Sequence, residues 1–127
     1  MSEELFSRNQ IDRFIRDELD SVPQLEALLL FWRRFPLNWT CENLARELYV
    51  SPETAQTILN HLATRQLILQ NGEAQYELRI ESPQKRDLLT SLEYIYRHEL
   101  IRVSKMIHAN ASPGLREFAR SFRFKKD

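Results

Sequence analysis

The most constraining feature of the chain is the stretch of residues 40–80, in which two short helical patterns lead directly into a hairpin pattern. Thr40 is a suitable N-cap for a helix over residues 41–48, because its side chain can accept hydrogen bonds from free backbone amides. Ser51-Pro52 predicts the start of the next helix, since serine caps amides and proline fits the first helical position. The order of these elements constrains the fold more than any one of them does.

The helix predicted over residues 52–66 has one apolar side and one polar side. Four apolar residues stand at positions i, i+3, i+4 and i+7, the spacing of a single buried stripe: Ala55, Ile58, Leu59 and Leu62. A step of about 100° per residue then places a set of polar side chains outward. They are Glu53, Gln56, Thr57, Asn60 and Thr64. The stripe predicts packing, whereas the polar face is available to a partner.

Residues 67–81 have the alternation of two strands around Asn71-Gly72. Asparagine and glycine tolerate the positive φ angles of a tight turn, so the segment predicts a β-hairpin. Gln66, just before it, occupies the place where glycine usually ends such a helix. This departure predicts a strained or shifted helix end.

Helical patterns also occupy both ends of the chain. An apolar face predicts a helix over residues 4–19, and a second helix begins after Ser21 and runs to about Phe35. Ser82-Pro83 opens the longest predicted helix, over residues 83–110. Its apolar residues recur at spacings of three and four, a pattern typical of a helix that packs along a partner helix. This predicted dimer seam consists of Leu89, Leu92, Tyr96, Leu100, Val103 and Ile107.

A helix, a short helix, a tight turn, a longer helix and a β-hairpin, in this order, form the winged helix-turn-helix arrangement. We therefore expect a mainly α fold with a small β-hairpin wing, whose winged helix-turn-helix domain spans residues 21–81. An N-terminal helical arm, residues 1–20, precedes it. A long dimerisation helix and a basic amphipathic tail helix, residues 82–127, follow it.

The stretch NLARELYVSPETAQTILNHLATRQLI, residues 43–68, resembles the helix-turn-helix of MarR-type and related bacterial transcriptional regulators. The resemblance extends over about residues 22–80. It rests on the leucine-alanine pair of the first motif helix, on Val50-Ser51 in the turn, and on Leu67-Ile68 at the start of the wing.

This resemblance implies that the second helix of the motif enters the DNA major groove with its first residues against base edges. The implied base contacts come from Glu53, Gln56, Thr57 and Asn60, among which the two amides can bind adenine in a bidentate manner. The implied phosphate contacts from the motif are those of Ser51, Thr54 and His61. The protein is then a homodimeric DNA-binding transcriptional regulator.

The net charge of zero conceals an uneven distribution. Residues 1–81 carry 8 basic and 13 acidic side chains, whereas residues 101–127 carry 7 basic and 2 acidic ones. The predicted tail helix bears most of the basic groups, namely Arg116, Arg120, Arg123, Lys125 and Lys126. We expect this helix to dock on the acidic body of its own chain. The alternatives are a position on a membrane surface and phosphate contacts with DNA.

A second function remains open because the predicted reading face carries no positive charge. Residues 38–80 hold 3 basic and 5 acidic side chains, and the wing tip has neither lysine nor arginine. Affinity for DNA comes largely from lysine and arginine that displace counterions from phosphates. The alternative is therefore an adaptor whose acidic winged-helix surface binds a basic partner protein without DNA.

Several other classes find no support in the sequence. A single cysteine excludes an internal disulfide, and with His61, His98 and His108 it makes no spacing typical of a metal site. No phosphate loop or nucleophile motif is present, so we expect neither catalysis nor a cofactor. The apolar run of residues 25–32 is too short to span a bilayer, and the start of the chain lacks a basic secretory leader. These features predict a cytoplasmic protein without membrane association.

Overall fold

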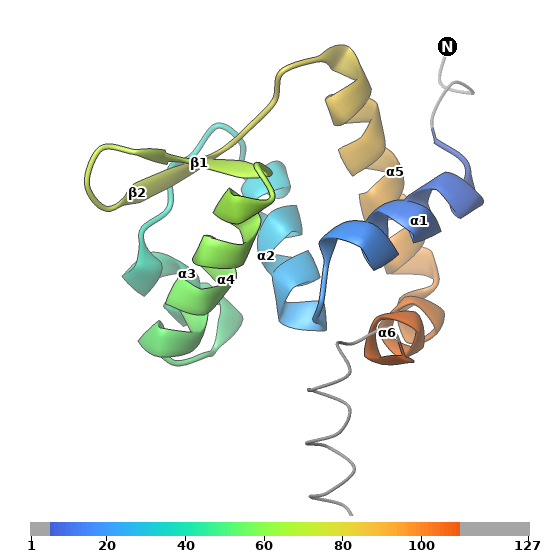
Figure 1. The fold of residues 1–127 in the computed structure, drawn as a ribbon, viewed down its shortest axis with the longest axis horizontal. Coiled ribbons are helices and arrows are strands. Elements are labelled where there is room, and N and C mark those ends of the chain that lie inside the picture. Colours follow the sequence, from blue (N-terminus) through green and yellow to red (C-terminus); the bar gives the residue numbers. More distant parts are fainter. Residues whose placement is uncertain (1–5, 110–127) are drawn as a thin grey trace, which may run out of the picture.

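The computed structural model describes residues 6–109, which form six helices and one two-stranded antiparallel sheet (Figure 1). The expected fold class, mainly α with a small β-hairpin, is confirmed. The elements are α1 (Arg8–Glu18), α2 (Val22–Arg33), α3 (Cys41–Leu48), α4 (Pro52–Thr64), β1 (Ile68–Asn71), β2 (Gln75–Leu78), α5 (Pro83–His98) and α6 (Leu100–Ala109).

Serine or threonine caps determine where the first five helices begin. The predicted caps Ser21, Thr40, Ser51 and Ser82 each accept a hydrogen bond from the backbone amide three residues later. At the start of α1, Ser7 forms a reciprocal capping box with Gln10, so this helix begins later than the apolar pattern predicted. Local chemistry thus sets these boundaries.

The hairpin follows α4 through a left-handed residue, as predicted from the missing glycine. Gln66 has a φ of 62°, and α4 already ends at Thr64. Asn71 pairs with Gln75 across the sheet, so the turn contains the three residues 72–74 rather than the two-residue Asn-Gly turn that was predicted. Gly72 accommodates this turn with a φ of 76°.

A third segment extends the sheet on the side of β2. Trp39 and Tyr76 exchange two backbone hydrogen bonds, each of 2.8 Å. The Trp39 ring is buried beside Phe31 of α2, with 5.9 Å between the ring centroids. The connection before α3 therefore anchors the hairpin to the helices.

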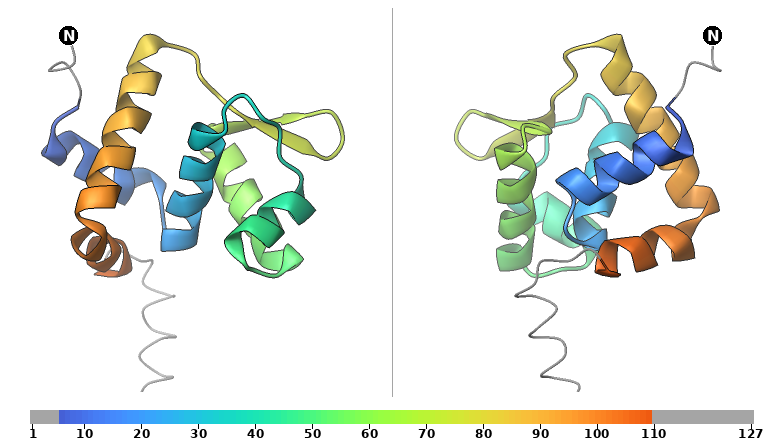
Figure 2. Two further views of the ribbon diagram at one scale, coloured as in Figure 1. Left: turned by 180° about the vertical axis from the view of Figure 1, so that it is seen from behind. Right: turned by 45° about the vertical axis from the view of Figure 1, so that its right-hand side comes forward.

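One hydrophobic core joins the three segments that the sequence predicted, namely residues 1–20, 21–81 and 82–127, as far as the structure describes them. It extends from Ile11 and Ile15 in α1, through α2 and the buried stripe of α4, to Val103 and Ile107 in α6. Helix α2 contacts α3, α4 and β2 and also contacts α5, so it lies between the hairpin side and the α1–α5–α6 side (Figures 1 and 2). Helix α1 is packed against α5 and α6 and is not a free arm.

The prediction of one continuous helix over residues 83–110 is wrong, because the chain turns at Glu99. This residue has a non-helical φ of −134° and ψ of 45°, and α6 starts again at Leu100 in a new direction (Figure 2). Hydrogen bonds from Arg8 and Arg102 hold the Glu99 carboxylate and keep its pKa below its usual range. Arg102 also pairs with Asp12, at 2.9 Å, which fixes α6 across α1.

The break removes the predicted dimer seam from the surface. Five of its six residues are buried in the core of their own chain, namely Leu89, Leu92, Tyr96, Val103 and Ile107. Leu100, in the first turn of α6, is 49% exposed. The spacing did identify a buried face, but helices of the same chain cover it.

The Tyr96 hydroxyl links the packed helices and allows a test of this correction. It donates a 2.9 Å hydrogen bond to the Glu26 carboxylate on α2. Burial, followed by the hydrogen bond to Glu26, raises the pKa of Tyr96 well above its ordinary value. Because the folded-state pKa lies above that of the unfolded chain, the associated stability is present below about pH 10 and is lost as the pH rises further.

Tyr96→Phe is therefore expected to lower the free energy of unfolding by about 1 kcal/mol at neutral pH, the usual contribution of one hydrogen bond. It should also make the loss of stability above about pH 10 less steep. Urea unfolding at pH 7 and in alkaline buffer measures both effects. Tyr94→Phe is the control, since Tyr94 is 62% exposed, and equal effects of the two variants would contradict the proposed role of Tyr96.

Candidate nucleic-acid interface

Helix α4 presents the polar face that the sequence predicted. Its apolar stripe is buried against α2 and α3, with Ala55, Leu59 and Leu62 fully covered. On the opposite side Glu53, Thr57, Asn60 and Thr64 are exposed, and Gln56 is half-buried. This side of α4 is therefore accessible to a partner.

Gln56 and Asn60 lie one turn apart and are joined to each other. The Gln56 Nε2 group donates to Asn60 Oδ1 at 2.9 Å and approaches the Tyr76 hydroxyl on β2 at 3.3 Å. Within residues 6–109, Gln56 Oε1 and Asn60 Nδ2 have no hydrogen-bond partner. The pair thus offers one acceptor and one donor in a fixed arrangement, which is the combination that an adenine edge complements.

The other candidates at the start of α4 are exposed but engaged locally. Ser51 Oγ caps the helix and donates to Thr54 Oγ1 at 3.0 Å. Thr57 Oγ1 donates to the Glu53 carbonyl at 3.1 Å. Each hydroxyl retains acceptor capacity towards a ligand, because an oxygen of this type has two lone pairs.

His61 is placed differently from the prediction. Its Nε2 lies 2.7 Å from the Glu18 carbonyl at the end of α1, and its Nδ1 lies 3.8 Å from the Asp20 carboxylate. The ring therefore packs against the α1–α2 connection, and its exposed fraction is 16%. A phosphate contact from His61 is not compatible with these interactions, which instead tie α4 to α1.

The remaining phosphate candidates belong to the predicted tail helix and lie outside the described residues. They are Arg116, Arg120, Arg123, Lys125 and Lys126. The basic character of this segment is therefore a property of the sequence alone.

Most arginines around α3, α4 and the hairpin are paired with carboxylates of the same chain. Arg34 lies 3.2 Å from Glu47, Arg65 lies 3.7 Å from Glu18, and Arg79 lies 3.5 Å from Glu81. These pairs are largely exposed and therefore contribute little to stability. Their main effect is to reduce the positive charge that is available near α4.

The first turn of α4 lies in a negative environment. Burial raises the pKa of the Cys41 thiol, and the carboxylates of Glu42 and Glu53 raise it further. The thiol donates to the Pro52 carbonyl at 3.2 Å, which places Cys41 beside the start of α4. An anionic ligand at this end therefore requires a cation from outside the first turn of α4.

Two exposed residues near this end were missed in the sequence. Arg46 on α3 donates to the Asn43 side chain at 3.2 Å instead of to a carboxylate, so its charge is retained. Tyr49 follows α3 with a φ of 59° and is 94% exposed. The sequence did contain a sign of this exposure. Tyr49 stands between Leu48 and Val50 in a turn whose packing needs only one apolar residue, so a large aromatic side chain there was free to face the solvent.

The described residues contain no cluster of three or more His, Cys, Asp or Glu side chains that can hold a metal ion. Among the helices of this same part of the chain, none combines the length and apolar character needed to cross a membrane. The chemistry of the candidate interface is therefore that of amides, hydroxyls and a few charged groups.

Comparisons with known proteins add little to this picture. No protein-family model and no curated protein matches the chain. A crystal structure of RV1404 from Mycobacterium tuberculosis is similar with 19% sequence identity, over 93% of this chain and 83% of that chain, at a TM-score of 0.49. What defines the protein is thus its own architecture, a mainly helical fold with a hairpin beside an exposed polar helix.

Proposed function

We propose that this chain is a winged helix-turn-helix protein that binds double-stranded DNA as a transcriptional regulator of the cytoplasm, with α4 as the recognition helix. The observation that carries the proposal is the joined pair of Gln56 and Asn60 on the accessible face of α4. A recognition helix reads base edges through side chains of this kind, and a bidentate amide discriminates adenine from the other bases. The contact with Tyr76 holds Gln56 in place before DNA arrives.

Phosphate contacts come from groups around this pair. Arg46 lies on α3, the helix that crosses the DNA backbone in such motifs, and its guanidinium is free of carboxylate partners within the described residues. Tyr49, Ser51 and Thr54 add neutral hydroxyl groups at the same end of α4.

The proposed regulator acts as a homodimer, in which two copies of α4 read half-sites about 34 Å apart. The buried seam cannot join the protomers, so the contact uses another surface. Tyr94, Leu100 and Ile101 are exposed apolar residues near the junction of α5 and α6, with Ile101 at 68% exposure. We place the dimer contact at these three residues. The C-terminal part of the chain then still forms the dimer, as the sequence predicted, but through an exposed face and not through the buried seam.

The test is binding to a pool of fluorescent duplexes, measured by anisotropy as a function of salt. Affinity should fall steeply as salt rises, because binding releases counterions from phosphates. Arg46→Ala should weaken binding to all sequences alike. It should also reduce the slope of log affinity against log salt by about the contribution of one phosphate contact. Arg97→Ala is the control, since Arg97 is exposed on α5 and pairs with Glu93 away from α4. A chain that binds no duplex at low salt is not a DNA-binding regulator.

The second candidate is an adaptor that binds a basic partner protein. Exposed carboxylates favour it, namely Glu42 and Glu47 on α3, Glu53 on α4 and Glu73 at the turn of the hairpin. The negative environment at Cys41 is consistent with this surface. Salt-sensitive binding to a basic protein, in the absence of any duplex binding, would select the adaptor.

A further inference from the structure

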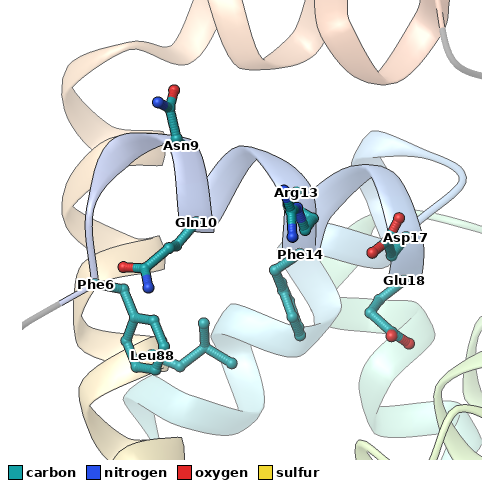
Figure 3. A pocket seen from close by; sticks show the side chains of 8 residues that line it. All are labelled: Phe6, Asn9, Gln10, Arg13, Phe14, Asp17, Glu18 and Leu88. Atoms are coloured by element: carbon teal, nitrogen blue, oxygen red, sulfur yellow. The ribbon is translucent and has the colours of Figure 1, made fainter.

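Helix α1 borders a groove that the core does not fill. The groove has a volume of about 400 Å³ and lies between α1 and the start of α5 (Figure 3). Phe6 and Leu88 stand close together at one end, Phe14 lies along the middle, and Asp17 and Glu18 occupy the other end. Asn9, Gln10 and Arg13 complete the lining, so the groove combines three large apolar side chains with polar ones and is acidic at one end.

The apolar residues of the groove are distinct from the core residues of the same helix. Ile11 and Ile15 of α1 are fully buried, whereas Phe6, Phe14 and Leu88 remain partly exposed. Three large apolar side chains in a row on the surface gain free energy when a further apolar group covers them. The groove therefore has the character of a docking site for an amphipathic segment.

The acidic end has unused charge. Asp17 is exposed, and within residues 6–109 no cation pairs with it. Glu18 has only the 3.7 Å contact with Arg65, which is long for an ion pair. A basic segment can therefore add ion pairs here without displacing strong existing ones.

We propose that this groove binds the C-terminal segment of the same chain, residues 110–127. In its sequence four apolar residues recur at the spacing i, i+3, i+4 and i+7, which predicts one apolar helical face: Leu115, Phe118, Ala119 and Phe122. An amphipathic helix with such anchors is the usual occupant of an apolar groove. The segment also carries five lysine and arginine residues against two acidic ones, whereas residues 1–81 carry 8 basic and 13 acidic side chains, so the charges of the segment and of the body are complementary.

The geometry of the chain allows this docking within one molecule. Helix α6 packs against α1, and Arg16 contacts the Met106 sulfur at 3.5 Å, next to the acidic end of the groove. The width of a helix is roughly 10–12 Å, and the five residues 110–114 can span roughly 16 Å when extended. From Leu115 to Phe122 a helix rises roughly 10 Å, which is shorter than the roughly 16 Å length of an 11-residue helix such as α1.

The experiment uses the full chain with Cys41→Ser and Ser121→Cys, and a nitroxide attached at position 121. The nitroxide should attenuate amide NMR signals of α1, most strongly near the start of this helix, and leave those of residues 72–74 unchanged. The turn of the hairpin is the control region, because it lies on the far side of the molecule from α1 (Figure 1). Absence of attenuation in α1, or equal attenuation in both regions, would overturn the proposal.

Two further measurements decide how the segment docks. Adding Phe118→Asp and Phe122→Asp should abolish the attenuation, whereas Ser112→Asp should preserve it; attenuation that survives both phenylalanine changes would rule out the apolar contact. A mixture of isotope-labelled chains without nitroxide and unlabelled chains with nitroxide should show no attenuation. Attenuation in the mixture would mean that the segment docks on a second copy, against the proposal. None of these outcomes depends on DNA binding.

Discussion

Leu92→Glu is expected to unfold the protein rather than to separate two protomers. Leu92 is fully buried in the core, on the side of α5 that faces the other helices of its own chain. Truncation of a buried leucine alone costs about 2–5 kcal/mol, and an unpaired carboxylate in an apolar site costs more. The sum approaches the whole stability of a typical small domain, about 5–15 kcal/mol.

Circular dichroism and thermal unfolding measure this effect directly. Thr90→Glu is the matched control, because Thr90 lies on the same helix and is exposed, so the same charge there should leave the melting temperature nearly unchanged. Sedimentation of the folded control reports the oligomeric state. A Leu92→Glu chain that remains folded with half the mass of the unmodified protein would restore the dimer seam and contradict the structure.

Gln56→Ala and Asn60→Ala are expected to lower affinity for the preferred duplex by about 10- to 100-fold each. A bidentate contact with a base contributes about 1–3 kcal/mol of discrimination, and about 1.4 kcal/mol corresponds to a factor of ten. Because the two side chains are hydrogen-bonded to each other, loss of either one should disturb both. The double variant should therefore lose less than the sum of the single ones.

The measurement is anisotropy with a selected duplex and with a scrambled one. Affinity for the scrambled duplex should stay nearly constant, since phosphate contacts are unchanged. Thr64→Ala is the control, as Thr64 is exposed at the opposite end of α4 from the cap. Thermal unfolding of Gln56→Ala separates a binding effect from the loss of its Tyr76 contact. If both amide variants bind the selected duplex normally, α4 is not the reading helix.

Predictions that depended on neighbouring residues in the sequence agree with the structure. The caps at Ser21, Thr40, Ser51 and Ser82 act within three residues, and the stripe of α4 follows from helical spacing. The polar face with Gln56 and Asn60 could be located for the same reason. The joining of this pair to Tyr76 could not, since it depends on where the hairpin packs.

The errors concern residues whose surroundings come from distant parts of the chain. The apolar spacing continues past Glu99, so the break there was not visible in the sequence. The distant Arg8, together with the neighbouring Arg102, holds the Glu99 carboxylate. His61 was predicted to contact a phosphate. In the structure its ring nitrogen lies instead within hydrogen-bond distance of the backbone carbonyl of Glu18, which is far away in sequence. Arg46 was overlooked because only the structure shows which arginines pair with carboxylates. Among the described residues Arg65 does so, whereas Arg46 donates to an amide side chain.

The amino-acid sequence alone determined the helix starts, the hairpin and the amphipathic faces, because hydrogen bonds and helical periodicity act over a few residues. Only the tertiary structure decided what each face meets. An apolar stripe has the same pattern whether its cover is a second protomer or a helix of the same chain, since burial of apolar area is not directional. Here the predicted seam is divided between α5 and α6 and is covered by helices of the same chain, whereas the apolar side chains of the groove beside α1 stay partly exposed.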